Sequence, residues 1–316
     1  MPAIPDEYLD CVVFLYASER HAEEGNTERG GTGFLVTVPM REGDEDGPRA
    51  TYVVTNWHCA KHTPTLRFNI RDGGTKTLTP AAGAWVHWED ERDDVAAFMV
   101  EPGAAYQYSA VPLTVADPEQ EAPPGTDVFF AGRYVTMSGV AKNTPMVRFG
   151  NVAMATQEPI RRRDGKYQDS ILVEARSRGG FSGSPVFTFT LAVTSFVTDP
   201  IAVGHARLGP PQLLGIVWGH HDEPAPVLGP DKETPIEPRA WVKTNTVLAY
   251  VVPSAKIAEL LNRPEERQVR EDKAKEIAAE AATEDYATDD EDRVSLAPLE
   301  PDEALRALLQ TPPAKE

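Results

Sequence analysis

Short runs of β-branched and aromatic residues, separated by turn residues, occupy most of the chain from Leu9 to about Pro253. Runs of this length and composition predict β-strands. The clearest are CVVFLYAS, GFLVTV, TYVVTNW, TLRFNI, DVAAFMV, DVFFAGRYV, MVRFGNVAMA, SILVEA, PVFTF, LLGIVWG and VLAYVV. Because no long helical segments alternate with them, we expect an antiparallel all-β sandwich or barrel and not a doubly wound fold.

A polar, Pro-containing stretch at 117–125, DPEQEAPPG, divides these runs into two groups of comparable size. Such stretches are typical of the segments that join domains. We therefore expect a first β-domain over residues 1–120 and a second over 121–263. The second domain includes a closing helix, since PSAKIAELLNR (253–263) has helical periodicity.

The composition changes beyond Pro264. Residues 264–316 hold 16 acidic and 7 basic residues, so they carry −9 of the chain's formal charge of −18. EERQVREDKAKEIAAEAA has little apolar face, and ATDDED is too charged to pack into a core. We expect an acidic tail that is largely disordered or a solvated helix, and that is a candidate surface for recruiting a protein partner.

The overall composition narrows the functional classes. At 316 residues, 41% hydrophobic and 25% charged, the chain resembles a soluble globular protein. Its acidic charge argues against nucleic acid as a partner, and no apolar run reaches the roughly 20 residues of a membrane span.

Two cysteines, Cys11 and Cys59, are too few for a disulfide framework. We expect reduced thiols and a cytoplasmic location, with a Cys11–Cys59 bridge as the minor alternative.

The stretch EARSRGGFSGSPVF (174–187) is the first candidate for chemistry, because it places Ser182 among glycines. Glycine adopts backbone conformations that a side chain forbids, so this turn can present a hydroxyl in a fixed geometry. A serine hydroxyl needs a base to remove its proton, and histidine suits that task near neutral pH. His58 in VVTNWHCA is the candidate base, and Asp94 in RDDVAAFMV is the candidate carboxylate that orients it. The amides of Gly180 and Ser182 are the candidate oxyanion hole.

TNWHCA, DDVAAF and GFSGSP occur in the order His, Asp, Ser, and each resembles the setting of a catalytic residue in chymotrypsin-like (trypsin-fold) serine peptidases. GTGFLVT (31–37) is similar to the family's glycine-rich strand before the histidine. DVFFAGRYV looks like the strand that opens the second barrel, and LLGIVWGHH like the strand that lines the substrate cleft. The resemblance covers roughly residues 8 to 262. It looks most like intracellular bacterial members and the protease domain of HtrA-type enzymes.

The resemblance implies a serine endopeptidase that acts on proteins or peptides without a cofactor or a metal. Its fold would be two six-stranded antiparallel β-barrels, with the site between them. His58 and Asp94 would come from the first barrel and Ser182 from the second. Asp93 is the competing carboxylate, but the family pattern of aspartate, aliphatic and alanine falls on Asp94.

The resemblance also implies a substrate pocket. Its floor would hold Arg176, and the cleft strand would contribute Val217, Trp218 and Gly219. An arginine at the floor would favour an acidic residue before the scissile bond, although Arg176 can equally face solvent or pair with Glu174.

Other interpretations of the same residues remain open. The chain can be a trypsin-fold protein that has lost activity and serves as a binding or regulatory module. It can also be an α/β-hydrolase esterase that uses Ser182, although Ser184 stands where the GxSxG turn of that fold needs glycine. HCAKH (58–62) and HHDE (220–223) contain metal-ligating residue types, but no second cluster at suitable spacing supports a zinc site.

Overall fold

The computed structural model describes residues 3–25, 30–113, 122–155, 158–162, 164–175, 180–189, 191–193, 206–231, 234, 237 and 241–291. The chain divides into two compact units, Met1–Arg267 and Gln268–Glu316. The first unit holds all the β-sheets described below.

The amino-terminal strands form an eight-stranded sheet, here called the first sheet. Its strands follow the order β5-β4-β1-β2-β3-β7-β6, and β8 pairs with β2. Every pair along that order is antiparallel, whereas β2 and β8 are parallel. The strands are β1 (Val12–Tyr16), β2 (Gly31–Pro39), β3 (Arg49–Thr55), β4 (Thr65–Asn69), β5 (Thr75–Leu78), β6 (Val86–His87), β7 (Ala96–Val100) and β8 (Val111–Pro112).

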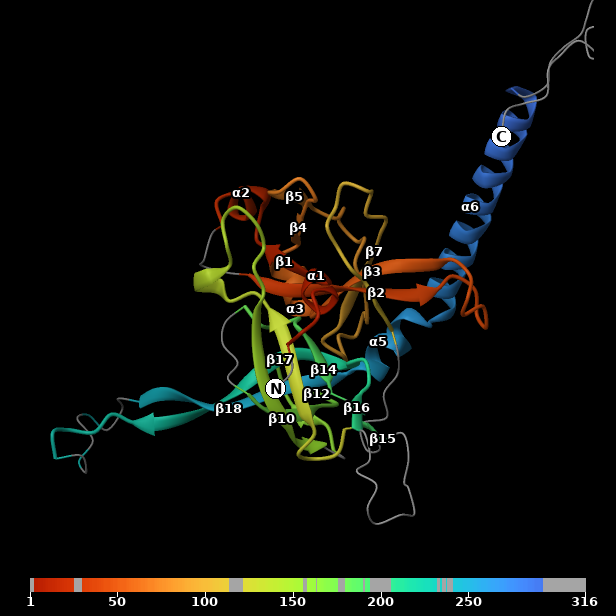
Figure 1. The fold of residues 1–316 in the computed structure, drawn as a ribbon. Coiled ribbons are helices and arrows are strands. Elements are labelled where there is room, and N and C mark those ends of the chain that lie inside the picture. Colours follow the sequence, from red (N-terminus) through yellow and green to blue (C-terminus); the bar gives the residue numbers. More distant parts are fainter. Residues whose placement is uncertain are drawn as a thin grey trace, which may run out of the picture. The chain divides into compact units, whose positions relative to one another are not determined.

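The following strands close into a barrel in the order β10-β13-β18-β17-β14-β9, here called the second barrel. Its strands are β9 (Asp127–Gly132), β10 (Met146–Ala155), β13 (Ile171–Glu174), β14 (Pro185–Thr188), β17 (Gln212–Pro226) and β18 (Trp241–Pro253). Beyond the barrel, β17 and β18 stay paired out to Pro226 and Trp241 and project as a two-stranded ribbon (Figure 1).

Shorter elements connect the strands. Two small hairpins pair β11 (Ile160–Arg161) with β12 (Tyr167–Gln168), and β15 (Leu191–Val193) with β16 (Ala206–Leu208). The helices are α1 (Glu7–Asp10), α2 (Glu19–Glu23), α3 (Trp57–His62), the 3-10 turn η1 (Val135–Met137), α5 (Ser254–Leu261) and α6 (Pro264–Glu291). None of the helices among the described residues is long and apolar enough to cross a membrane.

The expected all-β class is confirmed, and each apolar run named above contains a strand. The closed six-stranded second barrel and the closing helix α5 agree with the expectation. A closed six-stranded first barrel is not shown, since the described strands of that half form an eight-stranded sheet. It includes short strands, among them β8, which comprises only Val111–Pro112 and pairs with β2.

The alternative of an α/β-hydrolase is also wrong. That fold needs a mostly parallel sheet, whereas β2–β8 is the one parallel pair among the described strands. The expected boundary near residue 120 falls at 114–121, outside the described residues. In the expected tail, α6 is helical to Glu291, and 292–316 lie outside the described residues.

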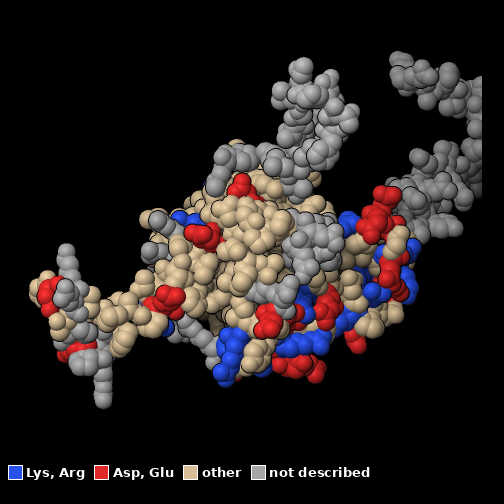
Figure 2. All heavy atoms as spheres, turned by 90° about the horizontal axis from the view of Figure 1, so that it is seen from below, with Lys and Arg blue, Asp and Glu red and all other residues tan. Residues whose placement is uncertain are grey.

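Each half of the first unit has its own apolar core. The core of the first sheet includes Val13, Leu15, Leu35, Val53, Leu66, Phe68 and Ala96. The core of the second barrel includes Val128, Phe130, Val152, Val173, Phe181, Val186 and Val251. On the face shown in Figure 2, Lys and Arg lie among Asp and Glu, next to a broad uncharged area.

Candidate active site

His58 lies in the first turn of α3, directly after β3. The sequence predicts the end of a strand at this position, but β3 ends at Thr55 and the helix begins at Trp57. Asn56, between them, is fully buried, and its side-chain Nδ2 donates to the carbonyl oxygen of Asp94 at 2.9 Å. This contact joins the start of the helix to the segment before β7.

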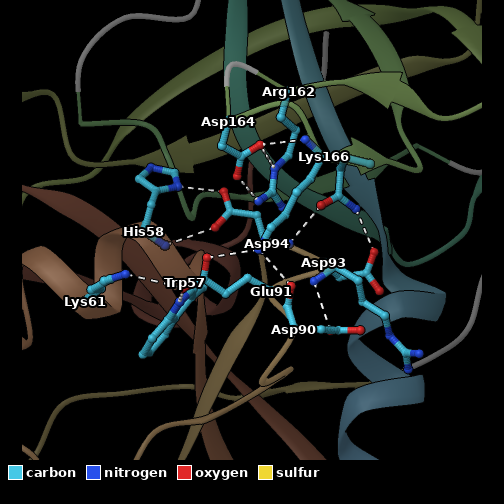
Figure 3. A network of polar contacts seen from close by, with 12 residues as sticks. Trp57, His58, Lys61, Asp90, Glu91, Asp93, Asp94, Arg162, Asp164 and Lys166 are labelled. Atoms are coloured by element: carbon cyan, nitrogen blue, oxygen red, sulfur yellow. Dashed lines mark hydrogen bonds and ion pairs between the residues drawn. The ribbon is translucent and has the colours of Figure 1, made fainter.

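His58 and Asp94 form two hydrogen bonds with each other (Figure 3). The backbone N–H of His58 donates to Asp94 Oδ1 at 3.0 Å, and His58 Nδ1 lies 2.6 Å from Asp94 Oδ2. A carboxylate only accepts, so the short contact places a proton on Nδ1 and leaves Nε2 as the acceptor of the neutral ring. The histidine is therefore oriented as a base through Nε2.

Cys59 lies beside that free nitrogen. Its Sγ is 3.4 Å from His58 Nε2 and 3.7 Å from the carbonyl oxygen of Ser182. The sulfur also packs against Gly31 of β2, where an added Cβ would lie 2.7 Å from it. One buried sulfur atom thus contacts both the candidate base and the residue that carries the candidate nucleophile.

The surroundings of His58 set its pKa. The His58 side chain is 45% exposed. Its partial removal from water would by itself lower the pKa, but the adjacent Cys59 sulfur and the Asp94 carboxylate raise it to about 11. Both neighbours favour the protonated ring. With a pKa of about 11 the ring is mostly protonated at neutral pH, so the neutral form that can accept a proton at Nε2 increases only as pH rises.

Ser182 lies in a turn shaped by glycine backbone. Gly180 and Gly183 have φ of 98° and 86°, the region that side chains rarely adopt. The Gly183 N–H donates to the carbonyl of Val217 at 2.7 Å, and the Val217 N–H donates to the carbonyl of Ser184 at 2.9 Å. The turn is therefore paired along strand β17.

Phe181 anchors the same turn in the second barrel. Its side chain is fully buried and packs edge-on against Phe130, with ring centroids 5.3 Å apart. Because consecutive side chains along such a turn point to different sides, an anchored Phe181 restricts where Ser182 points.

Thr32 of β2 ties this turn to the first sheet. Its N–H donates to the carbonyl of Ser182 at 2.8 Å, and its Oγ1 donates to the carbonyl of Gly180 at 2.7 Å. The same Oγ1 accepts the N–H of Arg133 at 2.8 Å, and its carbonyl accepts the hydroxyl of Thr55 at 2.6 Å. A buried threonine of one half thus holds the turn of the other.

The Ser182 side chain is half-buried. Within the described part of the chain, no hydrogen bond joins its hydroxyl to His58. The N–H groups of Gly180 and Ser182 likewise donate to no described residue, whereas both carbonyls accept from Thr32.

Comparison with known proteins identifies the family. The family model of the trypsin-like peptidase domain matches residues 31–193. This range includes His58, Asp94 and Ser182. The chain belongs to the trypsin-like peptidase family. No curated protein matches its sequence.

Solved structures match over most of the chain, at low identity. The protease domain of MamO from Magnetospirillum magneticum (apo form) is 16% identical, with a TM-score of 0.43, and the match covers 81% of this chain and 98% of that one. Deg5 is 15% identical, with a TM-score of 0.45 and coverage of 80% and 88%. An HtrA-type protease with tripeptide is 13% identical, with a TM-score of 0.43 and coverage of 79% and 58%.

In this member of the family the two adjacent aspartates have different partners. Asp94 contacts His58, whereas Asp93 accepts a hydrogen bond from Gln168 Nε2 at 2.9 Å and lies 3.9 Å from Lys256 Nζ. Burial raises the pKa of Asp93. Figure 3 shows Asp94 facing His58, with Asp93 on the other side of the network.

The residues expected to form the substrate pocket are only partly described. Val217 is buried and paired with the Ser182 turn, as described above. Trp218 stacks on Tyr250 with centroids 4.9 Å apart and donates to Ser170 Oγ at 3.1 Å, and Gly219 lies next to the same Tyr250 ring. Arg176 lies outside the described residues, together with 177–179.

The two cysteines are free thiols, so the Cys11–Cys59 bridge is not formed. Among the described residues, no group of three or more His, Cys, Asp or Glu side chains is arranged to hold a metal ion. In HHDE the side chains instead pair two by two along β17, His220 with Asp222 and His221 with Glu223.

The hairpin β11–β12 contributes residues to the site that the sequence did not single out (Figure 3). Lys166 Nζ lies 3.2 Å from Glu91 Oε2, and Trp57 Nε1 donates to Glu91 Oε1 at 2.9 Å. The hydrogen bonds from Trp57, Lys166 and Lys61 lower the pKa of Glu91 to about 2. Arg162 pairs with Asp164, and only 10% of its side chain is exposed.

Proposed function

We propose that this trypsin-like peptidase is an active serine endopeptidase, with Ser182 as nucleophile, His58 as general base and Asp94 as the carboxylate that orients His58. The observation that carries the proposal is the 2.6 Å contact between His58 Nδ1 and Asp94 Oδ2, which leaves His58 Nε2 as the acceptor. Support comes from Cys59 Sγ, which contacts both His58 Nε2 and the carbonyl oxygen of Ser182.

The chemistry follows from these positions. When a peptide carbonyl carbon is attacked by Ser182 Oγ, His58 Nε2 takes the hydroxyl proton, and the imidazolium is stabilised by Asp94. The carbonyl oxygen becomes an oxyanion, for which the N–H groups of Gly180 and Ser182 are the donors. His58 then protonates the leaving amine, and water repeats the sequence on the acyl-enzyme. During these steps Nε2 must exchange its contact with the Cys59 thiol for one with Ser182.

The test is labelling with a fluorophosphonate probe, followed by mapping of the labelled peptide. We expect the wild type to be labelled at Ser182, and neither Ser182→Ala nor His58→Ala to react. Matched controls lie close by: Ser184→Ala removes a buried hydroxyl from the same turn, and His62→Ala removes an exposed histidine from the same helix. Both controls are expected to react like the wild type.

Labelling that persists in Ser182→Ala, or that depends on His62 as much as on His58, would contradict the assignment. A folded wild type that no probe labels would favour the second candidate.

That second candidate is a catalytically inactive binding or regulatory module with the same fold. One observation favours it: His58 Nε2 is engaged by Cys59 at 3.4 Å, while among the described residues the Ser182 hydroxyl has no bond to His58. Peptide binding without hydrolysis, measured with wild-type protein, is the result that would establish it.

Three further expectations stay proposals. If Arg176 forms the pocket floor, a peptide library should show enrichment of Asp or Glu before the cleaved bond. The acidic tail is proposed to recruit a protein partner, and the location is proposed to be cytoplasmic.

A further inference from the structure

The hairpin β11–β12 lies in the carboxyl-terminal half, between β10 and β13 of the second barrel, yet it contacts the segment before β7 of the first sheet. Lys166 Nζ donates to the carbonyl of Asp90 at 2.7 Å, and it also pairs with Glu91. Gln168, two residues further on, is fully buried. The hairpin therefore carries a polar side chain from one half into the interior beside the candidate site.

The Gln168 side chain contacts both adjacent aspartates. Its Oε1 accepts the backbone N–H of Asp94 at 2.8 Å, and its Nε2 donates to Asp93 Oδ1 at 2.9 Å and to the carbonyl of Asp169 at 3.3 Å. An amide has one accepting and one donating end, so only one orientation satisfies these contacts. The reversed orientation would place NH₂ against N–H and oxygen against carboxylate.

With this contact, every polar group of Asp94 has a named partner. Its N–H donates to Gln168, its carbonyl accepts from Asn56, and its two carboxylate oxygens accept from His58. The main chain is thus held on both sides of the residue whose side chain must face the imidazole. Asn56 comes from the same half as His58, whereas Gln168 comes from the half that carries Ser182.

We propose that Gln168 is a positioning residue of the peptidase site: its amide fixes the backbone of Asp94 from the opposite half and keeps Asp93 turned away from His58. This inference rests on the proposed function. Gln168 touches neither His58 nor Ser182 in the structure's hydrogen bonds, so it acts through Asp94.

The first test compares Gln168→Ala with the wild type. Removing the amide leaves the N–H of Asp94 and a buried carboxylate oxygen of Asp93 without these partners, so the segment shifts to satisfy them. A displacement of about 1 Å at a catalytic group costs about 10²-fold in rate. We expect the fluorophosphonate labelling rate and kcat to fall by about this factor, with KM nearly unchanged.

The matched control is Gln107→Ala. Gln107 also places its amide nitrogen next to a carboxylate, 3.3 Å from Asp10 Oδ1, but it is exposed and none of its hydrogen bonds involves a residue of the candidate site. We expect this variant to keep the wild-type rate. If the rate of Gln107→Ala fell as much as that of Gln168→Ala, the loss of any amide–carboxylate contact would lower the rate. That result would overturn the proposal.

Gln168→Glu provides rescue by a near-isosteric side chain. When protonated, the introduced carboxyl group can donate to Asp93 and accept from Asp94, and when ionised it repels Asp93. The rate of this variant relative to wild type should therefore fall as pH rises. If Gln168→Ala does not fold, Gln168→Glu is the deciding test. A ratio of the Gln168→Glu rate to the wild-type rate that does not change with pH overturns the proposal.

A readout that needs no activity separates this inference from the proposed function. In the Ser182→Ala background, the pKa of His58 is followed by NMR with and without Gln168→Ala. Because the Asp94 carboxylate raises the pKa of His58, its displacement should lower that pKa towards its ordinary value of about 6.5. An unchanged His58 pKa, or an unchanged kcat, overturns the positioning role even if the peptidase is active. A lowered pKa supports it even if the wild type is never labelled.

Discussion

The two halves of the candidate site are fixed in different ways. The His58–Asp94 half is held by side-chain hydrogen bonds, each joining one named atom to another. The Ser182 half is held by its main chain, with Gly180 and Gly183 at positive φ and their neighbours paired with Thr32 and Val217.

This difference determines how each half responds to substitution. A side-chain network loses function when one atom changes its hydrogen-bonding capacity, although the fold survives. A closely packed main-chain turn cannot accept added atoms, so substitution there acts on stability. We therefore expect chemistry and folding to be separable by mutation between the two halves.

The largest effect is expected for Asp94→Asn. The change keeps the size of the side chain, but its NH₂ group can no longer accept the Nδ1 proton, so the imidazole adopts the wrong tautomer. A loss of about 10⁴-fold in kcat is expected on the basis of that mechanism, with little change in the free energy of unfolding. Asp90→Asn, in the same segment but exposed, is the control for peptide hydrolysis. Activity of Asp94→Asn within tenfold of wild type would contradict the assigned role.

The second effect concerns stability and is expected for Gly183→Ala. An added Cβ would lie 1.8 Å from the carbonyl oxygen of Thr32, at a φ of 86°. Gly73 has nearly the same φ, 85°, with no atom within 4 Å of an added Cβ. Gly73→Ala should cost only the conformational energy, about 1–2 kcal/mol, whereas Gly183→Ala should cost more than about 3 kcal/mol. Urea unfolding measures both, and equal losses would show that the contact with Thr32 is unimportant.

The smallest effect is a shift in pH dependence in Cys59→Ala. The neutral form of His58 acts as the base, so kcat/KM should rise with pH through the His58 pKa, which Cys59 and Asp94 raise above the ordinary value of about 6.5. Removing the sulfur should move this midpoint down. Cys11→Ala, which removes the other buried thiol, should leave it in place.

The same pKa shift has a consequence for stability with a definite sign. A raised folded-state pKa contributes stability that is fully present below about pH 6.5 and is lost as pH rises through the folded value. Cys59→Ala should reduce this contribution, so the difference in urea midpoint between neutral and alkaline pH should become smaller. A midpoint of kcat/KM that stays the same or rises would show that Cys59 does not act on His58.

Much of the fold is predictable from the sequence because strand-forming runs are local features. Each apolar run contains a strand, and the pattern at 94–96 indicates Asp94, the aspartate that contacts His58. The strand pairing at the edges of the first sheet could not be predicted, because it depends on short strands such as β6, which has only two residues.

The contribution of the β11–β12 hairpin to the candidate site also could not be predicted from the sequence. RRRDGK has the composition of a solvated turn, and indeed it connects two paired strands, but Arg162 is largely buried beside Asp164. Gln168 contacts residues 74 and 75 positions away. Nothing local in KYQDS distinguishes an interior glutamine from an exposed one, since its partners depend on where the hairpin docks.

Thr32 has a consequence for how the protein unfolds. Its main-chain and side-chain groups bond across the interface to Ser182, Gly180 and Arg133, and it is fully buried. If one half unfolded first, the polar groups of Thr32 and of its partners would lose their hydrogen bonds while still buried away from water. Amide hydrogen exchange in the two halves should accordingly share one opening free energy at this interface, so that both parts of the candidate site are lost in a single cooperative event.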